Sequence, residues 1–209
     1  MRGRLLGLAA ATLLAACAPR YVGRSRPIDP IVTATPTWDR APNVVAHRQR
    51  AMNDCGVAAA ATVVSRWRGA EAAEALMAGE RAPRHGLRAR AIRDLLRARG
   101  LKAFVIAGTF ADLEHELEAG RPVIIGTVKP VDGRRAIAHY EVVVAIEPER
   151  RVVMTHDPSL GWRQMSYDDL EREWKASKRT TIVALPATTT SDATVSAEAG
   201  PSRRPSVPR

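Results

Sequence analysis

Hydrophobic positions follow two periods along the chain, first the 3.6-residue period of helices and later the alternation of strands. Residues 55–67 are rich in Ala and Val and predict a helix with Asp54 at its capping position. Further helices are predicted over 70–78, 87–99 and 167–174, and between the cap residue Thr109 and residue 117. Runs rich in β-branched residues predict strands over 102–106, 123–128, 139–146, 152–155 and 180–185. Helices at the front and a mostly antiparallel sheet behind them predict an α+β fold.

These elements lie between residues 43 and 186, and we expect them to form one domain, for which a chain of 209 residues is long enough. Residues 17–42 contain five prolines together with several Arg and Thr residues, which predicts an extended tether. Residues 187–209 are mostly Thr, Ser, Ala and Pro, and we expect a disordered tail there.

Charge and composition argue against several classes of protein. Lys and Arg number 32 against 22 Asp and Glu, and the resulting net charge of +10 would suit nucleic acid. The arginines are spread along the whole chain, however, and aromatic residues make up only 4%, so we expect no nucleic-acid partner. Two cysteines are too few for a disulfide-rich scaffold or a Cys-rich zinc module, and the sequence has no phosphate-binding loop. We therefore expect no metal and no cofactor; the oligomeric state stays open.

The amino terminus has the pattern of an export signal. Two arginines precede an apolar run over residues 5–14, which is too short to span a bilayer. The Leu-Ala-Ala-Cys sequence that ends at Cys17 resembles the bacterial lipobox, in which the Cys receives diacylglycerol and becomes the first mature residue. This resemblance implies a signal peptide over 1–16 and a lipid anchor at Cys17, in the bacterial cell envelope. Ala18 after the Cys favours the periplasmic face of the outer membrane; the alternative is an ordinary cleaved signal with an incidental Cys.

The second cysteine, Cys55, opens the first predicted helix between Asp54 and Gly56. Backbone N–H groups at a helix start favour the thiolate form of a cysteine. In an exported protein such a thiol is a buried structural residue, a partner for an intermolecular disulfide or a nucleophile. Gln49, six residues upstream, could supply a side-chain amide that together with a backbone N–H forms an oxyanion hole.

A thiolate nucleophile also needs a base and a group that orients the base. Among five histidines, His139 heads a Val-rich predicted strand, and Asp157 follows the next strand along the chain. Antiparallel neighbouring strands can bring these two side chains together, so that the Asp fixes the imidazole tautomer. Taken separately, His139 is also consistent with an ordinary strand-edge histidine and Asp157 with a plain Asp-Pro turn.

The combined pattern resembles the bacteriocin-processing cysteine peptidases, family thirty-nine of the cysteine class, over residues 47–177. The matching motifs are Gln49, the sequence Asn53-Asp54-Cys55-Gly56-Val57-Ala58, His139-Tyr140 and Asp157-Pro158. The resemblance implies a papain-like fold in which Cys55 attacks, His139 is the general base, Asp157 orients it and Gln49 assists the oxyanion hole. Well-known members cut leader peptides after Gly-Gly, a substrate that stays open for this chain. Glu141 is an unusual residue after His139-Tyr140, and we expect it to affect the charge preference for substrates.

The sequence therefore predicts a membrane-anchored cysteine peptidase that acts on a peptide or protein substrate. One alternative is a peptidoglycan hydrolase of the NlpC type, which usually carries Asp-Cys-Ser-Gly, whereas the Ser is missing after Cys55. The other is a non-catalytic lipoprotein that keeps the same fold to bind peptides.

Overall fold

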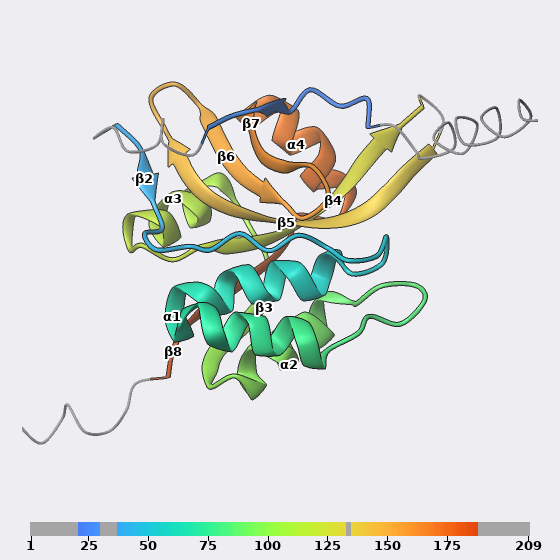
Figure 1. Ribbon diagram of the computed structural model, residues 1–209. Helices are drawn as coiled ribbons and strands as arrows, with labels where there is room; N and C mark the ends of the chain where they lie inside the picture. The colour runs from blue at the N-terminus through green and yellow to red at the C-terminus, as the bar shows by residue number, and fades with distance from the viewer. Residues whose placement is uncertain (1–20, 30–36, 133–134, 188–209) are drawn as a thin grey trace, which may run out of the picture.

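The computed structural model describes residues 21–29, 37–132 and 135–187 (Figure 1). The expected signal peptide, the expected lipidation residue Cys17 and the expected tail from residue 188 onward lie outside the described residues. The helices are α1 (Cys55–Gly79), α2 (Ala89–Ala98), α3 (Phe110–Glu118) and α4 (Tyr167–Ala176). The strands are β1 (Arg26–Pro27), β2 (Asp39–Arg40), β3 (Leu101–Ala107), β4 (Val123–Val131), β5 (Arg135–Glu147), β6 (Val152–Asp157), β7 (Gly161–Ser166) and β8 (Thr180–Pro186).

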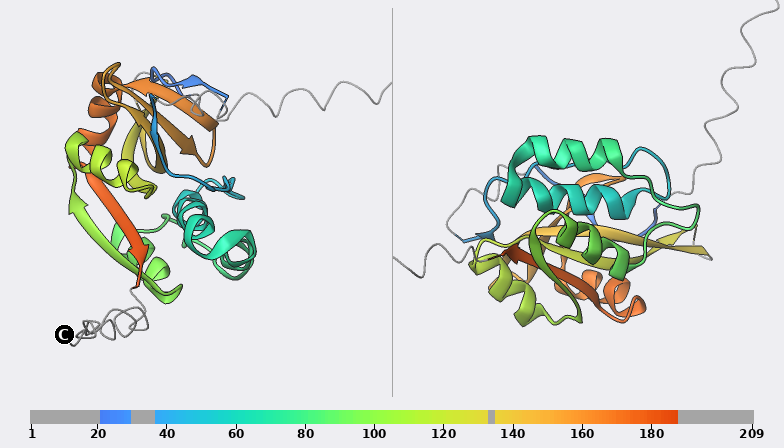
Figure 2. Two further views of the ribbon diagram at one scale, coloured as in Figure 1. Left: turned by 90° about the vertical axis from the view of Figure 1, so that its left-hand side faces the viewer. Right: turned by 90° about the horizontal axis from the view of Figure 1, so that it is seen from below.

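The strands form one sheet in the order β1-β7-β6-β5-β4-β8-β3, with β2 paired to β5. Every strand pair among the described residues is antiparallel. Helices cover both faces of this sheet, and two views of the ribbon show the two helical layers (Figure 2). The predicted α+β fold, with helices on a mostly antiparallel sheet, is confirmed.

Alternating strand residues build a separate hydrophobic core on each face of the sheet. Ile124 and Val142 pack with the residues of α1 and α2. Their neighbours Val123, Ile125 and Val143 pack with α3 and α4 on the opposite face. Burial on both faces explains why these runs are continuously hydrophobic rather than alternating.

The two predicted helices at 55–67 and 70–78 both form; they share the label α1 and are separated by a kink at Gly69, which has a non-helical backbone conformation. Gly69 has φ of 81°, a left-handed conformation that glycine adopts without steric cost. Asp54 precedes the helix as expected, but its side chain does not cap a helix N–H. Its carboxylate instead accepts hydrogen bonds from Arg50 Nε at 3.0 Å and from the Ala82 backbone N–H at 3.2 Å. Asp54 therefore connects the start of α1 to a residue before the helix and to a residue after it.

The segment expected to be a tether contributes to the sheet wherever the structure describes it. Strand β1 pairs with β7, and β2 pairs with β5. Trp38 beside β2 is only 7% exposed and belongs to the core on the α1 face. Residues 21–29 and 37–42 are therefore part of the folded unit, ahead of the start that we expected at residue 43.

Candidate active site

Cys55 is the first residue of α1 and is buried, with 6% of its surface exposed. The backbone N–H groups of Val57 and Ala58 both donate to the Asp54 carbonyl oxygen at 3.0 Å, which closes the first turn immediately after the thiol. A Cβ atom at Gly56 would lie 2.9 Å from the Cδ1 atom of Ile92 in α2. The glycine after the cysteine therefore allows the start of α1 to pack closely against α2.

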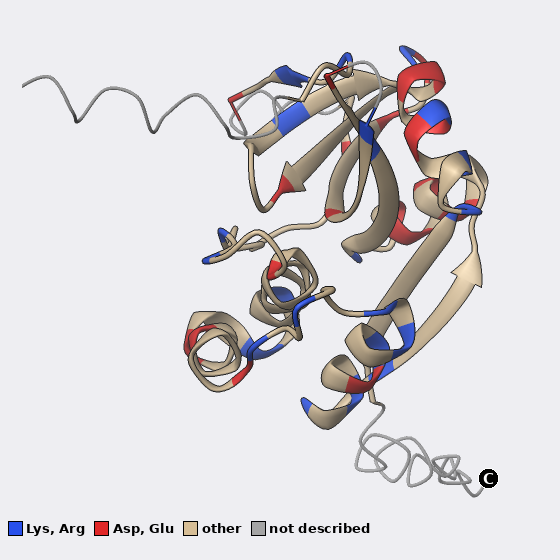
Figure 3. Ribbon diagram, turned by 90° about the vertical axis from the view of Figure 1, so that its right-hand side faces the viewer, with Lys and Arg blue, Asp and Glu red and all other residues tan. Residues whose placement is uncertain are grey.

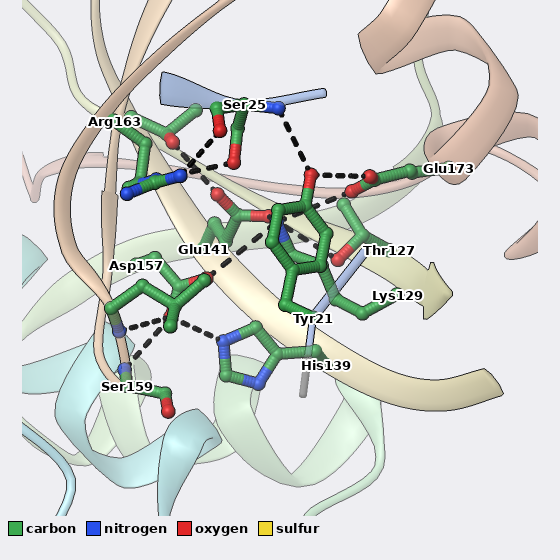
Figure 4. A network of polar contacts seen from close by, with 12 residues as sticks. Tyr21, Ser25, Thr127, Lys129, His139, Glu141, Asp157, Ser159, Arg163 and Glu173 are labelled. Carbon is green, nitrogen blue, oxygen red and sulfur yellow. Dashed lines mark hydrogen bonds and ion pairs between the residues drawn. The ribbon is translucent and has the colours of Figure 1, made fainter. Parts of the chain in front are cut away.

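His139 and Asp157 come together across neighbouring antiparallel strands. His139 lies on β5, and Asp157 is the last residue of β6. Nε2 of His139 lies 2.8 Å from Oδ1 of Asp157, and both side chains are buried. Strand pairing thus produces the contact that the sequence predicted, as Figure 4 shows.

The turn after β6 also holds the Asp157 carboxylate. Oδ1 of Asp157 accepts hydrogen bonds from the backbone N–H groups of Ser159 at 2.7 Å and Leu160 at 3.0 Å. Oδ1 of Asp157 thus accepts the hydrogen bonds of the turn and also contacts His139, so the Asp-Pro turn and the histidine contact are compatible. These fixed donors leave the carboxylate little freedom to rotate away from the imidazole.

Burial by itself lowers the pKa of His139, but hydrogen bonds to Asp157 and to Cys55, together with the charges of both, raise it to about 10. Since Asp157 occupies Nε2, the other ring nitrogen, Nδ1, is left for the cysteine. Burial raises the pKa of Asp157, whereas the His139 bond and charge, the Lys129 ammonium and the Leu160 N–H outweigh it and hold that pKa well below its usual range. The site therefore favours the imidazolium form of His139 beside the Asp157 carboxylate.

Gln49 and Cys55 line two cavities that meet at His139. Gln49 lines a cavity of about 210 Å³ together with His139 and Asp157. Cys55 lines a second cavity of about 790 Å³, and His139 also lines this one. The backbone N–H of Gln49 donates to the Pro158 carbonyl at 3.0 Å, which ties the glutamine to the turn after β6. The structure therefore brings all four predicted site residues to one region.

The other histidines take no part in this pair. The ring of His156 lies 5.0 Å from the Trp162 ring, and burial lowers the pKa of His156 to about 4 despite the nearby Asp157 charge. His47 is buried, and burial likewise lowers its pKa against the charge of Glu74. His85 lines the cavity of Cys55.

The expectation that Glu141 affects substrate charge preference is wrong, because its side chain is fully buried. One carboxylate oxygen lies 2.6 Å from Nζ of Lys129. Lys129 was not among the predicted site residues, because the strand was expected to end at residue 128. A recognisable signal was present, since Lys129 and Glu141 are charged residues in two adjacent β-rich runs.

Within residues 21–29, 37–132 and 135–187, no group of three or more His, Cys, Asp or Glu side chains could hold a metal ion. No helix in the same part of the chain has the length and hydrophobicity to cross a membrane. Lys and Arg occur on many helices and strands rather than on one element, as Figure 3 shows.

A buried cysteine at a helix start, beside a histidine–aspartate pair on an antiparallel sheet, defines the class of papain-like cysteine hydrolases. The family model of the peptidase C39 family matches residues 43–186, and the chain belongs to this family. It is therefore a cysteine peptidase. No curated protein sequence matches the chain.

Several solved structures share the fold of this chain. The peptidase domain of Streptococcus ComA, a bifunctional ABC transporter involved in a quorum-sensing pathway, aligns with a TM-score of 0.55 and 20% identity over 68% of this chain and 97% of that domain. A double-glycine-motif protease from an AMS/PCAT transporter, solved with the leader peptide, aligns with a TM-score of 0.55 and 20% identity, covering 71% of this chain and 94% of that one. A C39-like peptidase from Bacillus anthracis gives a TM-score of 0.54 at 14% identity, covering 72% and 98%.

Proposed function

We propose that the protein hydrolyses peptide bonds with a triad of Cys55, His139 and Asp157. The observation that carries this proposal is the buried 2.8 Å contact between His139 and Asp157, beside a thiol at the start of α1. Family membership supports cysteine peptidase chemistry, and the geometry supplies residues in the three roles that it requires.

In the first step the Cys55 thiolate forms a bond to the carbonyl carbon of the peptide, and the carbonyl oxygen becomes an oxyanion. The His139 imidazolium then gives its proton to the leaving amine as the carbon–nitrogen bond breaks, which leaves a thioester. In the second step His139 takes a proton from water as the water oxygen bonds to the thioester carbon. The carbon–sulfur bond then breaks, the acid product leaves, and the Cys55 thiolate and the His139 imidazolium are restored. Asp157 keeps the imidazole ring in the orientation that both proton transfers need.

Gln49 acts as a donor to the oxyanion together with the Cys55 backbone N–H. Its position in the cavity beside His139 supports this role, as does its backbone bond to Pro158 at 3.0 Å, which fixes the residue relative to Asp157. A side-chain amide and a helix-start N–H are the donors that such a hole requires.

The substrate is a peptide or protein segment that runs along the two adjoining cavities. One similar structure is a protease in complex with a leader peptide, which supports a peptide ligand for this fold. The cavity of about 790 Å³ at Cys55 has room for the residues that flank a scissile bond. Cleavage after a double glycine is one version of this proposal.

The mature protein is held on the membrane of the bacterial envelope by lipid on Cys17, at the periplasmic face of the outer membrane. The lipobox-like sequence before Cys17 supports this part of the proposal. Replacing Cys17 with Ala should abolish incorporation of an alkyne-labelled fatty acid and release the protein from the membrane fraction. Equal labelling of both chains would contradict the anchor.

An electrophilic activity-based probe tests the triad. The reduced wild-type protein should be labelled, Cys55→Ala should not, and His139→Ala should be labelled at least about 100-fold more slowly because its base is missing. His115→Ala is the matched control, because His115 is an exposed histidine on α3. Labelling of Cys55→Ala would contradict the proposal, and so would release of fragments from purified peptidoglycan with no cleavage of any peptide.

A further inference from the structure

A buried lysine lies directly behind the catalytic aspartate. Lys129, on β4, is 5% exposed, and its Nζ atom lies 3.5 Å from Oδ2 of Asp157. The same atom lies 2.6 Å from a carboxylate oxygen of Glu141 and 3.2 Å from one of Glu173 (Figure 4). An ammonium group costs several kcal/mol to remove from water, so its position depends on all three carboxylates.

The two oxygens of Asp157 have different partners. Oδ1 accepts from His139 and from the backbone N–H groups of Ser159 and Leu160. Oδ2 faces Lys129 alone among the ion pairs of the described residues. A cation at one oxygen and three donors at the other define the rotation of the carboxylate, which in turn sets the direction of the bond to His139.

Lys129 is held in turn by groups from three other parts of the chain. Glu141 on β5 also accepts from the Thr155 hydroxyl at 2.7 Å, which fixes this carboxylate. Glu173 on α4 accepts from the Tyr21 hydroxyl at 2.8 Å. The Tyr21 ring lies over Lys129, with Nζ 4.6 Å from the ring centroid, and a β-bridge to Val131 holds this tyrosine in place.

Both Lys129 and Asp157 have other partners besides each other. Lys129 has close partners in Glu141 and Glu173. Asp157 likewise has three hydrogen bonds without the lysine. The additional contact joins two groups that each have other partners, and it falls on the carboxylate oxygen that those three hydrogen bonds do not hold.

We infer that Lys129 is a positioning residue for the catalytic Asp157, kept in place by Glu141 and Glu173 and covered by Tyr21. This inference rests on the proposed function. It adds to that proposal a second group of residues, which acts on the reaction only through the orientation and charge of Asp157. It also makes the segment before β1 part of the active site, because Tyr21 comes from there.

The test uses Lys129→Met and the double variant Lys129→Met with Glu141→Gln. The single variant leaves Glu141 without its closest cation, and so it can fail to fold. The double variant removes one positive and one negative group together, while the new amide can still accept from Thr155, so its melting temperature should stay near that of the wild type. Lys175→Met, at an exposed lysine on α4, is the matched control.

In the double variant we expect kcat for peptide cleavage to fall about 10- to 100-fold, with KM within about twofold of the wild type, because the histidine is misoriented but the cavity is intact.

Lys129 lowers the pKa of Asp157, so without it Asp157 takes up a proton at higher pH. The acid limb of the labelling rate against pH should therefore move to higher pH, which a purely structural role would not cause. The groups that face Asp157 are His139 and Lys129, with Glu141, Glu173 and Tyr21 around the lysine.

Three outcomes would overturn the inference. A folded double variant with unchanged kcat and an unchanged acid limb would show that Asp157 needs no cation. A raised KM with unchanged kcat would make Lys129 a substrate contact, since it also lines the cavity of Gln49. A wild-type protein without labelling or cleavage would remove the proposed function and this inference with it.

Discussion

Replacing Asp157 with Ala and with Asn separates its two effects on His139, orientation and charge. Ala removes the 2.8 Å contact with His139 Nε2 altogether. Asn can keep it, because the backbone N–H groups of Ser159 and Leu160 both donate to Oδ1 and so hold an acceptor at that position. The amide nitrogen of Asn then faces Lys129, at the place where Oδ2 lies 3.5 Å from Nζ. The Asp157→Asn variant would therefore orient the imidazole but would not carry the charge.

The pKa of His139 sets the size of the effect. Its rise from 6.5 to about 10, against the lowering effect of burial, corresponds to roughly 5 kcal/mol of preference for the imidazolium. Asp157 and Cys55 both contribute through hydrogen bonds and charge. Loss of the aspartate charge should therefore lower the pKa of His139.

The assay is the rate of thiol alkylation and of peptide cleavage against pH. In the wild type the imidazolium persists until His139 loses its proton near pH 10, and only then should the rate of leaving-group protonation fall. In both variants this alkaline limb should begin at lower pH than in the wild type, because the negative charge that favours the imidazolium is gone. Near neutral pH we expect kcat to fall about 10-fold for Asp157→Asn and about 100- to 1,000-fold for Asp157→Ala.

Asp168→Asn is the control, since it removes a carboxylate from an exposed position on α4. The reasoning is refuted if Asp157→Asn keeps the alkaline limb of the wild type, because the charge would then not set the pKa of His139. It is also refuted if Asp157→Ala is as active as Asp157→Asn, because orientation would then contribute nothing.

Three further predictions concern packing, the oxyanion and acid–base stability. Gly56→Ala should lower the stability by about 1–3 kcal/mol in thermal unfolding, because its Cβ would lie 2.9 Å from a side-chain atom of α2; Gly79→Ala in the same helix, with nothing within 4 Å, should not. Gln49→Ala should reduce kcat about 100-fold with the labelling rate of the thiol little changed, whereas Gln164→Ala on β7 should affect neither; an unchanged kcat would exclude the glutamine from the oxyanion hole. His139 has a raised pKa in the folded state, so its contribution to stability is complete below about pH 6.5 and should be lost as the pH rises toward 10. Urea unfolding at pH 6, 8 and 10 measures this loss, and a flat profile that is the same in His139→Ala would contradict it.

Local sequence patterns were sufficient for most of the elements, but not for all. The cap Thr109 does begin α3, where its hydroxyl accepts from the Asp112 N–H and the Asp112 carboxylate accepts from the Thr109 N–H at 2.8 Å. Strand β7 was missed, because Gly161–Ser166 has no clear alternation of hydrophobic and polar residues. It forms because β6 and β1 on either side satisfy its backbone groups, which is a tertiary effect.

The residues of the candidate site likewise fall into two groups, those that the sequence predicted and those that it did not. Gln49, Cys55, His139 and Asp157 could be found in the sequence through short motifs. Cys55 opens α1 and Asp157 ends β6, but His139 lies inside β5, which begins at Arg135 and not at the histidine. Lys129 and Tyr21 could not be found so. A lysine after an apolar run indicates the end of a strand as long as its buried carboxylate partners are unknown. A tyrosine in a proline-rich segment belongs to no periodic pattern from which its position could be predicted.

The sequence by itself determined the fold class and the residues that can carry cysteine peptidase chemistry, since periodicity, caps and short motifs depend on near neighbours in the chain. Only the tertiary structure decided which buried charges surround those residues. The contact between Lys129 and Asp157 joins two strands, β4 and β6. Tyr21, which covers the lysine, comes from the amino-terminal segment, and its hydroxyl donates to Glu173, 152 residues further along the chain. Such contacts follow from how the sheet and the amino-terminal segment pack, and the electrostatics of the active site depend on them.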